Sequence, residues 1–159
     1  MEKRMPEILA RIEGYKKKEE ITMRIGIDTN TIFAILGRTD SKYAATFFSQ
    51  NHEFFGSTFL IVALFKHKER ILKKSKITDA ERYHQLHLIL DTLQIIPSTE
   101  ITTANYYKAF KVCRNAGTKD IDYIALALEK NALLSTKDKP IIAALKQSGI
   151  IELFTPQTF

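Results

Sequence analysis

Short apolar runs alternate along this chain with longer amphipathic stretches, and each kind of segment predicts a different element. Strands are predicted at 24–29, 53–57, 94–97, 132–136 and 150–154. Helices are predicted at 30–37, 41–50, 58–75, 77–93, 101–117, 120–131 and 139–149. Buried strands that alternate with helices favour a mainly parallel sheet with helices on both faces. The pattern therefore predicts an α/β domain arranged as an α/β/α sandwich.

Residues 1–22 stand apart from this alternation. Pro6 suits the first position of a helix, and the apolar side chains between Ile8 and Tyr15 share one helical face. Charged residues then interrupt the pattern, and a strand follows Met23 directly. We expect an N-terminal helical extension over 1–22 and one domain over 23–159.

The composition is typical of a soluble globular protein. Of 159 residues, 45% are hydrophobic and 26% are charged, and no apolar run approaches the ~20 residues of a spanning helix. The N-terminus alternates charges and lacks the apolar core of a secretion signal. The single cysteine, Cys113, excludes an internal disulfide and fits a reducing compartment. We expect a cytoplasmic protein without membrane contact.

Positive charge is concentrated in one short segment. From Met23 onward the chain holds 18 basic and 13 acidic residues, and residues 66–76 alone hold six Lys or Arg and one Glu. This segment accounts for the whole surplus. It is either a solvated helix face or a strip that binds phosphates. In the second case the RNA-binding candidates are Lys66, Arg70, Lys73, Lys74 and Lys76.

Three aspartates occur where parallel α/β folds place their functional groups. Asp28 ends the first predicted strand, Asp138 follows the strand at 132–136, and Asp120 begins a helix. Ligands in such folds bind at the carboxyl ends of the strands. Each aspartate alone is equally explained as a helix cap. Three carboxylates at one edge would repel one another unless a hard cation such as Mg²⁺ or Mn²⁺ lay between them.

Four segments together carry a resemblance to a known family. They are "RIGIDTNTIFAIL", "FKHKERI", "DIDYIALALEKNALLSTKD" and the closing strand, in that order. Over residues 23–159 the chain resembles a PIN domain and is most similar to VapC-type toxins of prokaryotic toxin–antitoxin pairs. The resemblance implies a five-stranded parallel sheet between helices. It also implies an endoribonuclease dependent on Mg²⁺ or Mn²⁺, an antitoxin as partner, and a homodimer.

The resemblance assigns roles to individual residues. The family's first acid corresponds to Asp28, its third acid to Asp120, and the Asp of its T-x-D motif to Asp138, so these three are the implied catalytic and metal-binding residues. Three neighbouring polar residues are expected to support them: Asn30, Thr136 of the T-x-D motif, and Asp122. Because Asp122 lies ~200° round a helix from Asp120, it is expected to point elsewhere or to hold a water at the rim.

The family's second acid is missing from this chain. Family members commonly read "ELFKHKE" where this chain reads "ALFKHKE", so Ala63 stands at that catalytic position. Glu69 is ~240° round the helix from it and should face away. Lys66, His67 and Arg70 share the face of Ala63 and bring no acid. Either an engineered Glu→Ala change, which we favour because the flanking motif is intact, or a natural loss explains the alanine.

Two functions therefore remain open. One is a metal-dependent ribonuclease toxin that is inactive or impaired through Ala63. The other is a PIN-like module that binds RNA or protein without cleaving it. The aromatic residues Tyr106, Tyr107 and Phe110 are expected in the core or in dimer contacts, and the sequence does not indicate base stacking by them.

Overall fold

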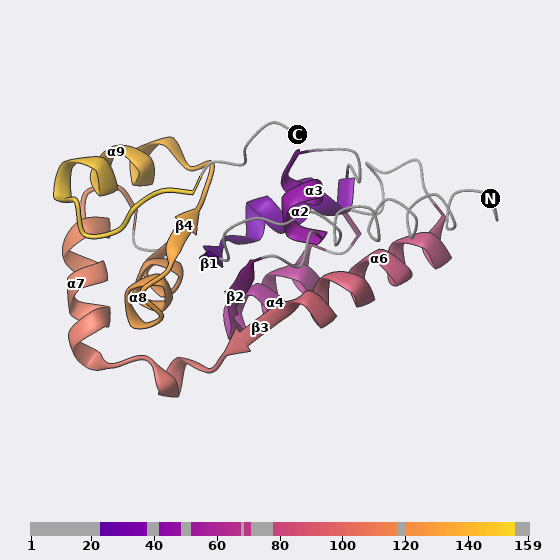
Figure 1. Ribbon diagram of the computed structural model, residues 1–159, viewed down its shortest axis with the longest axis horizontal. Helices are drawn as coiled ribbons and strands as arrows, with labels where there is room; N and C mark the ends of the chain where they lie inside the picture. Colours follow the sequence, from indigo (N-terminus) through magenta and orange to yellow (C-terminus); the bar gives the residue numbers. More distant parts are fainter. Residues whose placement is uncertain are drawn as a thin grey trace.

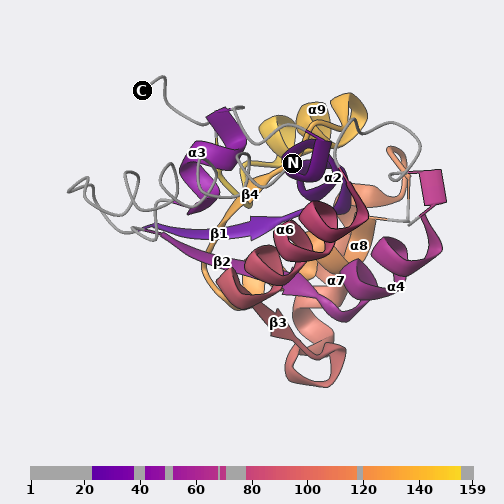
Figure 2. The same ribbon diagram turned by 90° about the vertical axis from the view of Figure 1, so that its right-hand side faces the viewer.

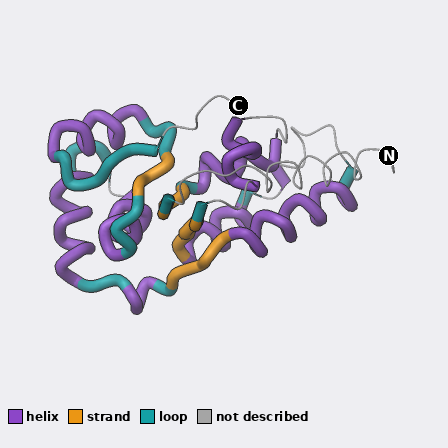
Figure 3. Tube along the Cα trace, viewed as in Figure 1, coloured by secondary structure: helices purple, strands orange, loops and turns teal. Residues whose placement is uncertain are grey.

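A four-stranded parallel sheet of order β3-β2-β1-β4 forms the centre of the computed structural model (Figure 1). The strands are β1 (Arg24–Ile27), β2 (Glu53–Ser57), β3 (Leu93–Ile96) and β4 (Leu133–Ser135). The structure describes residues 23–37, 42–48, 52–67, 69–70, 78–117 and 120–154. Within this part of the chain, the sheet lies between two layers of helices, which confirms the predicted α/β/α sandwich (Figure 3).

Each face of the sheet has its own helix layer and its own hydrophobic core. One layer consists of α2 (Thr29–Gly37), α3 (Lys42–Phe48), α4 (Thr58–Lys66) and α6 (Asp79–Thr92). The other consists of α7 (Thr103–Cys113), α8 (Ile121–Glu129) and α9 (Lys139–Ser148), after the short 3-10 helix η1 (Ser98–Glu100). Ile25 and Phe54 pack with the first layer, whereas Phe55 and Leu134 pack with the second. In the rotated view of Figure 2, α4 and α6 of the first layer lie in front of α7 and α8 of the second.

Helix α8 lies close against β1 because both elements carry small residues at the contact. A Cβ atom at Gly26 would lie 3.4 Å from the Cβ of Ala127, so any larger pair would push the helix outward. Residues 123–127 of α8 are buried as a continuous stretch. This packing fixes the start of α8, with Asp120, near the end of β1.

The register of the strands determines which residues meet at the carboxyl edge of the sheet. β1 pairs with β2 through Gly26 and Phe55, and with β4 through Ile27 and Ser135. Continuing the first register by two residues sets Ser57 beside Asp28, and Thr136 follows β4 at the same edge. The edge predicted to hold the functional groups is therefore built from β1, β2 and β4.

Two predicted elements differ from the structure. The expected fifth strand at 150–154 is reduced to an isolated parallel bridge between Leu134 and Leu153, so the prediction of about five strands was wrong by one. β4 is only three residues long and offers one residue to this pairing. The helix expected over 58–75 is interrupted: α4 ends at Lys66, where the backbone of His67 leaves the helical conformation. Residues 69–70 are helical again, and residues 71–75 lie outside the described ranges.

Some predictions fall on residues outside the described ranges. These are the N-terminal extension at 1–22 and the candidate RNA-binding residues Lys73, Lys74 and Lys76. None of the described helices is long and apolar enough to cross a membrane.

Candidate active site

Asp28 is buried at the end of β1, where its side chain caps α2. Only 5% of the residue is exposed. The backbone N–H and the hydroxyl of Thr31 both donate hydrogen bonds to its Oδ1 atom, at 2.8 and 2.6 Å. The same hydroxyl lies 3.5 Å from the carbonyl oxygen of Ser135 in β4. Both bonds to the carboxylate use one oxygen, so they fix its orientation without occupying Oδ2.

Asp138 occupies the equivalent place after β4. Its Oδ1 atom accepts a hydrogen bond from the backbone N–H of Ile141 at 3.1 Å and so caps α9. Its own backbone N–H donates to the hydroxyl of Thr136 at 3.2 Å. Thr136 therefore holds the short loop that carries Asp138, which is a supporting position of the kind expected for it. Both aspartates cap helices, and both do so with a single carboxylate oxygen.

Asp120 stands at the start of α8 and differs from the other two because its side chain does not cap the helix. Its charge acts on two buried neighbours, Tyr123 and Cys113. Burial raises the pKa of the Tyr123 phenol, and the charges of Asp28 and Asp120 raise it further. Burial also raises the pKa of the Cys113 thiol to about 11, with contributions from Asp120 and Asp138. The charge of Asp120 therefore acts on one buried group that Asp28 also affects and on another that Asp138 also affects.

Tyr123 joins the start of α8 to the end of β1. Its hydroxyl is hydrogen bonded to the hydroxyl of Thr29, the residue after Asp28. The tyrosine is 8% exposed. Sequence reasoning did not single out Tyr123, because the two bonded residues are 94 positions apart. It also missed Thr31, although an acceptor followed three residues later by a donor is a recognisable capping pattern.

The other two polar candidates do not contact the acids as Thr136 does. Asn30 is exposed in the first turn of α2, and Thr31 supplies the hydrogen bonds to Asp28 instead. Asp122 turns toward α7, where its Oδ1 atom accepts a hydrogen bond from the hydroxyl of Tyr106 at 3.2 Å. Burial raises the pKa of the Asp122 carboxyl. This orientation agrees with the expectation that Asp122 points elsewhere.

Position 63 shares a helical face with His67, which contacts α2, the helix that follows Asp28. Ala63 is half-buried in α4, and its carbonyl oxygen accepts a hydrogen bond from the backbone N–H of His67 at 3.0 Å. Residues four apart share a helical face, and the His67 ring packs edge-on against Phe33 of α2, with centroids 5.9 Å apart. A longer side chain at position 63 would therefore extend along α2.

The donors at this edge are oxygen atoms, the kind of ligand that a hard divalent cation takes. Carboxylate oxygens suit Mg²⁺ or Mn²⁺, and Mg²⁺ commonly uses one or two carboxylates while it keeps several waters. Among the described residues, no group of three His, Cys, Asp or Glu side chains is close enough to hold an ion. The Ser57 hydroxyl beside Asp28 is buried and has no hydrogen-bond partner within the described part of the chain. The edge thus has fitting oxygen donors and an unsatisfied polar atom, but no complete cage.

Two described candidates for RNA binding, Lys66 and Arg70, are exposed. Lys66 is the last residue of α4, three residues after Ala63. Their role toward RNA stays a prediction.

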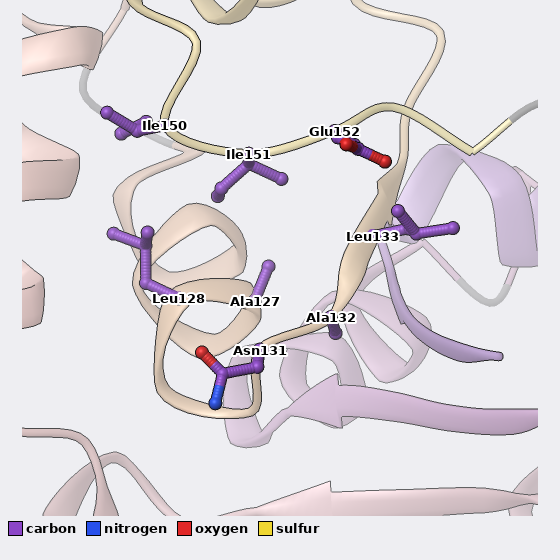
Figure 4. A pocket seen from close by; sticks show the side chains of 8 residues that line it. All are labelled: Ala127, Leu128, Asn131, Ala132, Leu133, Ile150, Ile151 and Glu152. Carbon is purple, nitrogen blue, oxygen red and sulfur yellow. The ribbon is translucent and has the colours of Figure 1, made fainter.

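A pocket of about 290 Å³ lies elsewhere, where the end of α8 and the start of β4 meet residues 150–152 (Figure 4). Six of its eight lining residues are aliphatic, and Asn131 and Glu152 contribute its polar side chains. Because Asn131 precedes β4, this pocket is at the amino end of that strand, opposite to Asp138. It is therefore separate from the acidic edge.

In this parallel α/β sandwich, Asp28 and Asp138 follow the carboxyl ends of two neighbouring strands, β1 and β4. The PIN domain family matches residues 27–153, from the end of β1 to the bridge at Leu153. The chain belongs to this family, whose members are nucleases and generally depend on metals. The search of curated proteins found no match.

Proposed function

We propose that the chain is an endoribonuclease of the VapC-like toxin type that acts with Mg²⁺ or Mn²⁺, and that Ala63 leaves it inactive or impaired. The observation that supports the proposal is the placement of Asp28 and Asp138 after two adjacent parallel strands. Asp120 precedes α8, whose Tyr123 is hydrogen bonded to Thr29, the residue after Asp28. When bound, a divalent cation supplies Lewis-acid stabilisation of the charge that develops at a phosphodiester. The residues that would hold it are Asp28, Asp120 and Asp138.

In this proposal the chain's own residues orient the carboxylates and concentrate negative charge at one edge of the sheet. Thr31 fixes the Asp28 carboxylate through two hydrogen bonds, and Thr136 fixes the loop of Asp138. Negative charge gathered at one edge would repel RNA phosphates, so the site requires counter-charge. We propose that a bound metal cation, together with exposed cationic side chains such as those of Lys66 and Arg70, supplies this positive charge.

Position 63 explains why this chain would be a poor enzyme. A glutamate there would extend from α4 along α2 toward Asp28 and would add a fourth carboxylate. Losing one preorganised electrostatic group typically costs about 10²–10³ in rate, and losing an acid that holds the metal should cost at least as much. Alanine is a strong helix former, so the fold tolerates its presence.

A protein partner is part of this proposal. Helix α4 exposes three large apolar side chains near Ala63: Phe59, Val62 and Phe65 are 54%, 57% and 69% exposed. Such a face suits a docked protein. We propose that an antitoxin segment covers it and places a cation against the acidic edge, and that the chain also forms a homodimer.

RNA cleavage by the Ala63→Glu variant tests the enzymatic proposal. The variant should cut a labelled RNA in the presence of Mg²⁺ or Mn²⁺, and EDTA should abolish the cutting. Ala63→Gln is the matched control, because it has the same length without the charge and should stay inactive. Equal cleavage by all three forms would show that position 63 lies outside the site.

The second candidate function is a PIN-like module that binds RNA or protein without cleavage. The observation that favours it is Ala63 itself, because no acid from the same helical face replaces the missing glutamate. If Ala63→Glu binds RNA but does not cleave any of several RNAs with either metal, the binding module becomes the better description.

A further inference from the structure

Helix α7 carries an aromatic and basic face that the proposed chemistry does not use. Tyr107, Phe110, Lys111 and Arg114 are spaced at i, i+3, i+4 and i+7, so they form one stripe along the helix. Tyr107 and Phe110 are 59% and 44% exposed. The opposite side of the helix, with Ala109 and Cys113, is buried against α8 and α9. We call these four residues the α7 stripe.

The α7 stripe consists of two aromatic and two positively charged residues. Between Thr102 and Gly117 the sequence has no acidic residue, while it has Lys108, Lys111 and Arg114. The ammonium group of Lys111 lies 4.6 Å from the centre of the Tyr107 ring. A cation held beside an exposed ring is well placed to contact the phosphate of a nucleotide whose base stacks there.

The stripe leads toward the end of α8 that carries Asp120. At the start of α7, Thr102 and Asn105 donate hydrogen bonds to Glu129 at the end of α8, so the two packed helices run antiparallel. Arg114, at the end of α7, therefore lies toward the start of α8, which Asp120 precedes. From Arg114 back to Tyr107 the helix is about 10 Å long. This length corresponds to roughly three nucleotides at the rise of about 3.4 Å in stacked nucleic acid.

The chemistry of the stripe favours nucleic acid over a protein surface. The exposed large apolar residues of α4 include Val62, and that face has one cation, Lys66. Those of α7 are both aromatic and are flanked by cations on successive turns. Aromatic rings accept any base by stacking, and the cations follow the backbone.

We propose that the α7 stripe binds single-stranded RNA, with bases stacked on Tyr107 and Phe110 and phosphates at Lys111 and Arg114. This inference rests on the proposed function, because it takes RNA to be the substrate and leads the strand from the acidic edge along α7. It replaces the expectation that these aromatic residues serve only as core or dimer contacts.

The test uses the full chain with Ala63, because a chain that does not cut RNA permits equilibrium binding. A fluorescein-labelled single-stranded RNA of mixed sequence is titrated in EDTA, and its anisotropy gives the Kd at several salt concentrations. Tyr107→Ala and Phe110→Ala should each weaken binding roughly 5- to 100-fold. Tyr83→Ala is the matched control, since Tyr83 is 54% exposed on α6 in the other helix layer. It should bind like the parent chain.

Two further variants separate stacking from simple apolar contact. Phe110→Tyr keeps an aromatic ring and should retain affinity, whereas Phe110→Leu should lose it. Arg114→Gln should reduce the slope of log K against log salt by about 0.7, the value for one phosphate contact on a single strand. If Phe110→Leu binds RNA as well as Phe110→Tyr, base stacking on this residue is overturned. If Arg114→Gln leaves the salt slope unchanged, the phosphate contact of Arg114 is overturned.

Light scattering of the same variants distinguishes the alternative occupant. If Tyr107→Ala and Phe110→Ala bind RNA within twofold of the parent chain but change its oligomeric state, the stripe is a protein interface and the proposal is wrong. The proposed function fails separately. In that case Ala63→Glu would not cleave RNA, while the α7 variants would still lose RNA binding.

Discussion

Removing the Thr31 hydroxyl should destabilise the end of β1 by an amount that the geometry allows us to estimate. Thr31 is 1% exposed, and its Oγ1 atom lies 2.6 Å from Oδ1 of the buried Asp28. Thr31→Val has nearly the same shape but no hydroxyl. The carboxylate keeps the backbone N–H of residue 31 as a donor and loses the shorter bond. Hydrogen bonds to charged groups contribute about 1.5–3 kcal/mol, so this is the expected loss in the free energy of unfolding.

Thermal unfolding at pH 7 measures this loss. For a chain of this length, 1 kcal/mol corresponds to about 2–4 °C, so the Tm of Thr31→Val should fall by roughly 3–12 °C. Thr31→Ser is the control, because it keeps the hydroxyl and removes one methyl group, which contributes about 0.8 kcal/mol. If Thr31→Val is as stable as Thr31→Ser, or more stable, the Thr31 hydroxyl does not hold Asp28 and the reasoning is refuted.

The structure leads to two further predictions, one about Gly56 and one about Cys113. Gly56→Ala should destabilise the fold by about 1–3 kcal/mol in urea unfolding, because the new Cβ would lie 2.8 Å from Cδ2 of the fully buried Leu60; unchanged stability would mean that this contact relaxes freely. Because the pKa of Cys113 is raised to about 11, its thiol stays protonated at pH 8 and should react with a disulfide reagent on the order of 100-fold more slowly than in urea. The thiolate is disfavoured in the folded state, so this group should also lower stability as pH rises from about 9 to 11; equal labelling rates in the folded and unfolded chain would contradict both statements.

Local sequence signals were sufficient for the four strands of the sheet and for the positions of two of the three acids, Asp28 and Asp138. Asp28 and Asp138 each follow a short apolar strand, and the carboxyl end of a parallel strand is where such residues gather. The caps of α6 at Thr78 and of α9 at Asp138 also follow from local chemistry, since both side chains accept a backbone N–H three residues later.

The features that sequence reasoning missed depend on contacts between distant segments. Tyr123 meets Thr29 only because α8 packs on β1, and no spacing along the chain indicates that pair. The end of α4 at Lys66 was equally hidden, since the residues that follow are themselves compatible with a helix. The expected last strand is apolar, but only Leu153 pairs with β4. Apolar character alone does not determine how many residues find a partner strand.

Binding of Mn²⁺ measures most directly whether Asp28, Asp120 and Asp138 form one metal site with position 63. The free Mn²⁺ signal in electron paramagnetic resonance is followed while each protein is added. Ala63→Glu should bind one Mn²⁺ that Mg²⁺ displaces, and the parent chain should bind it at least 10- to 100-fold more weakly. Adding Asp28→Asn to Ala63→Glu should weaken binding again by a similar factor. Equal Mn²⁺ affinity in all three proteins would contradict a metal site at this edge of the sheet.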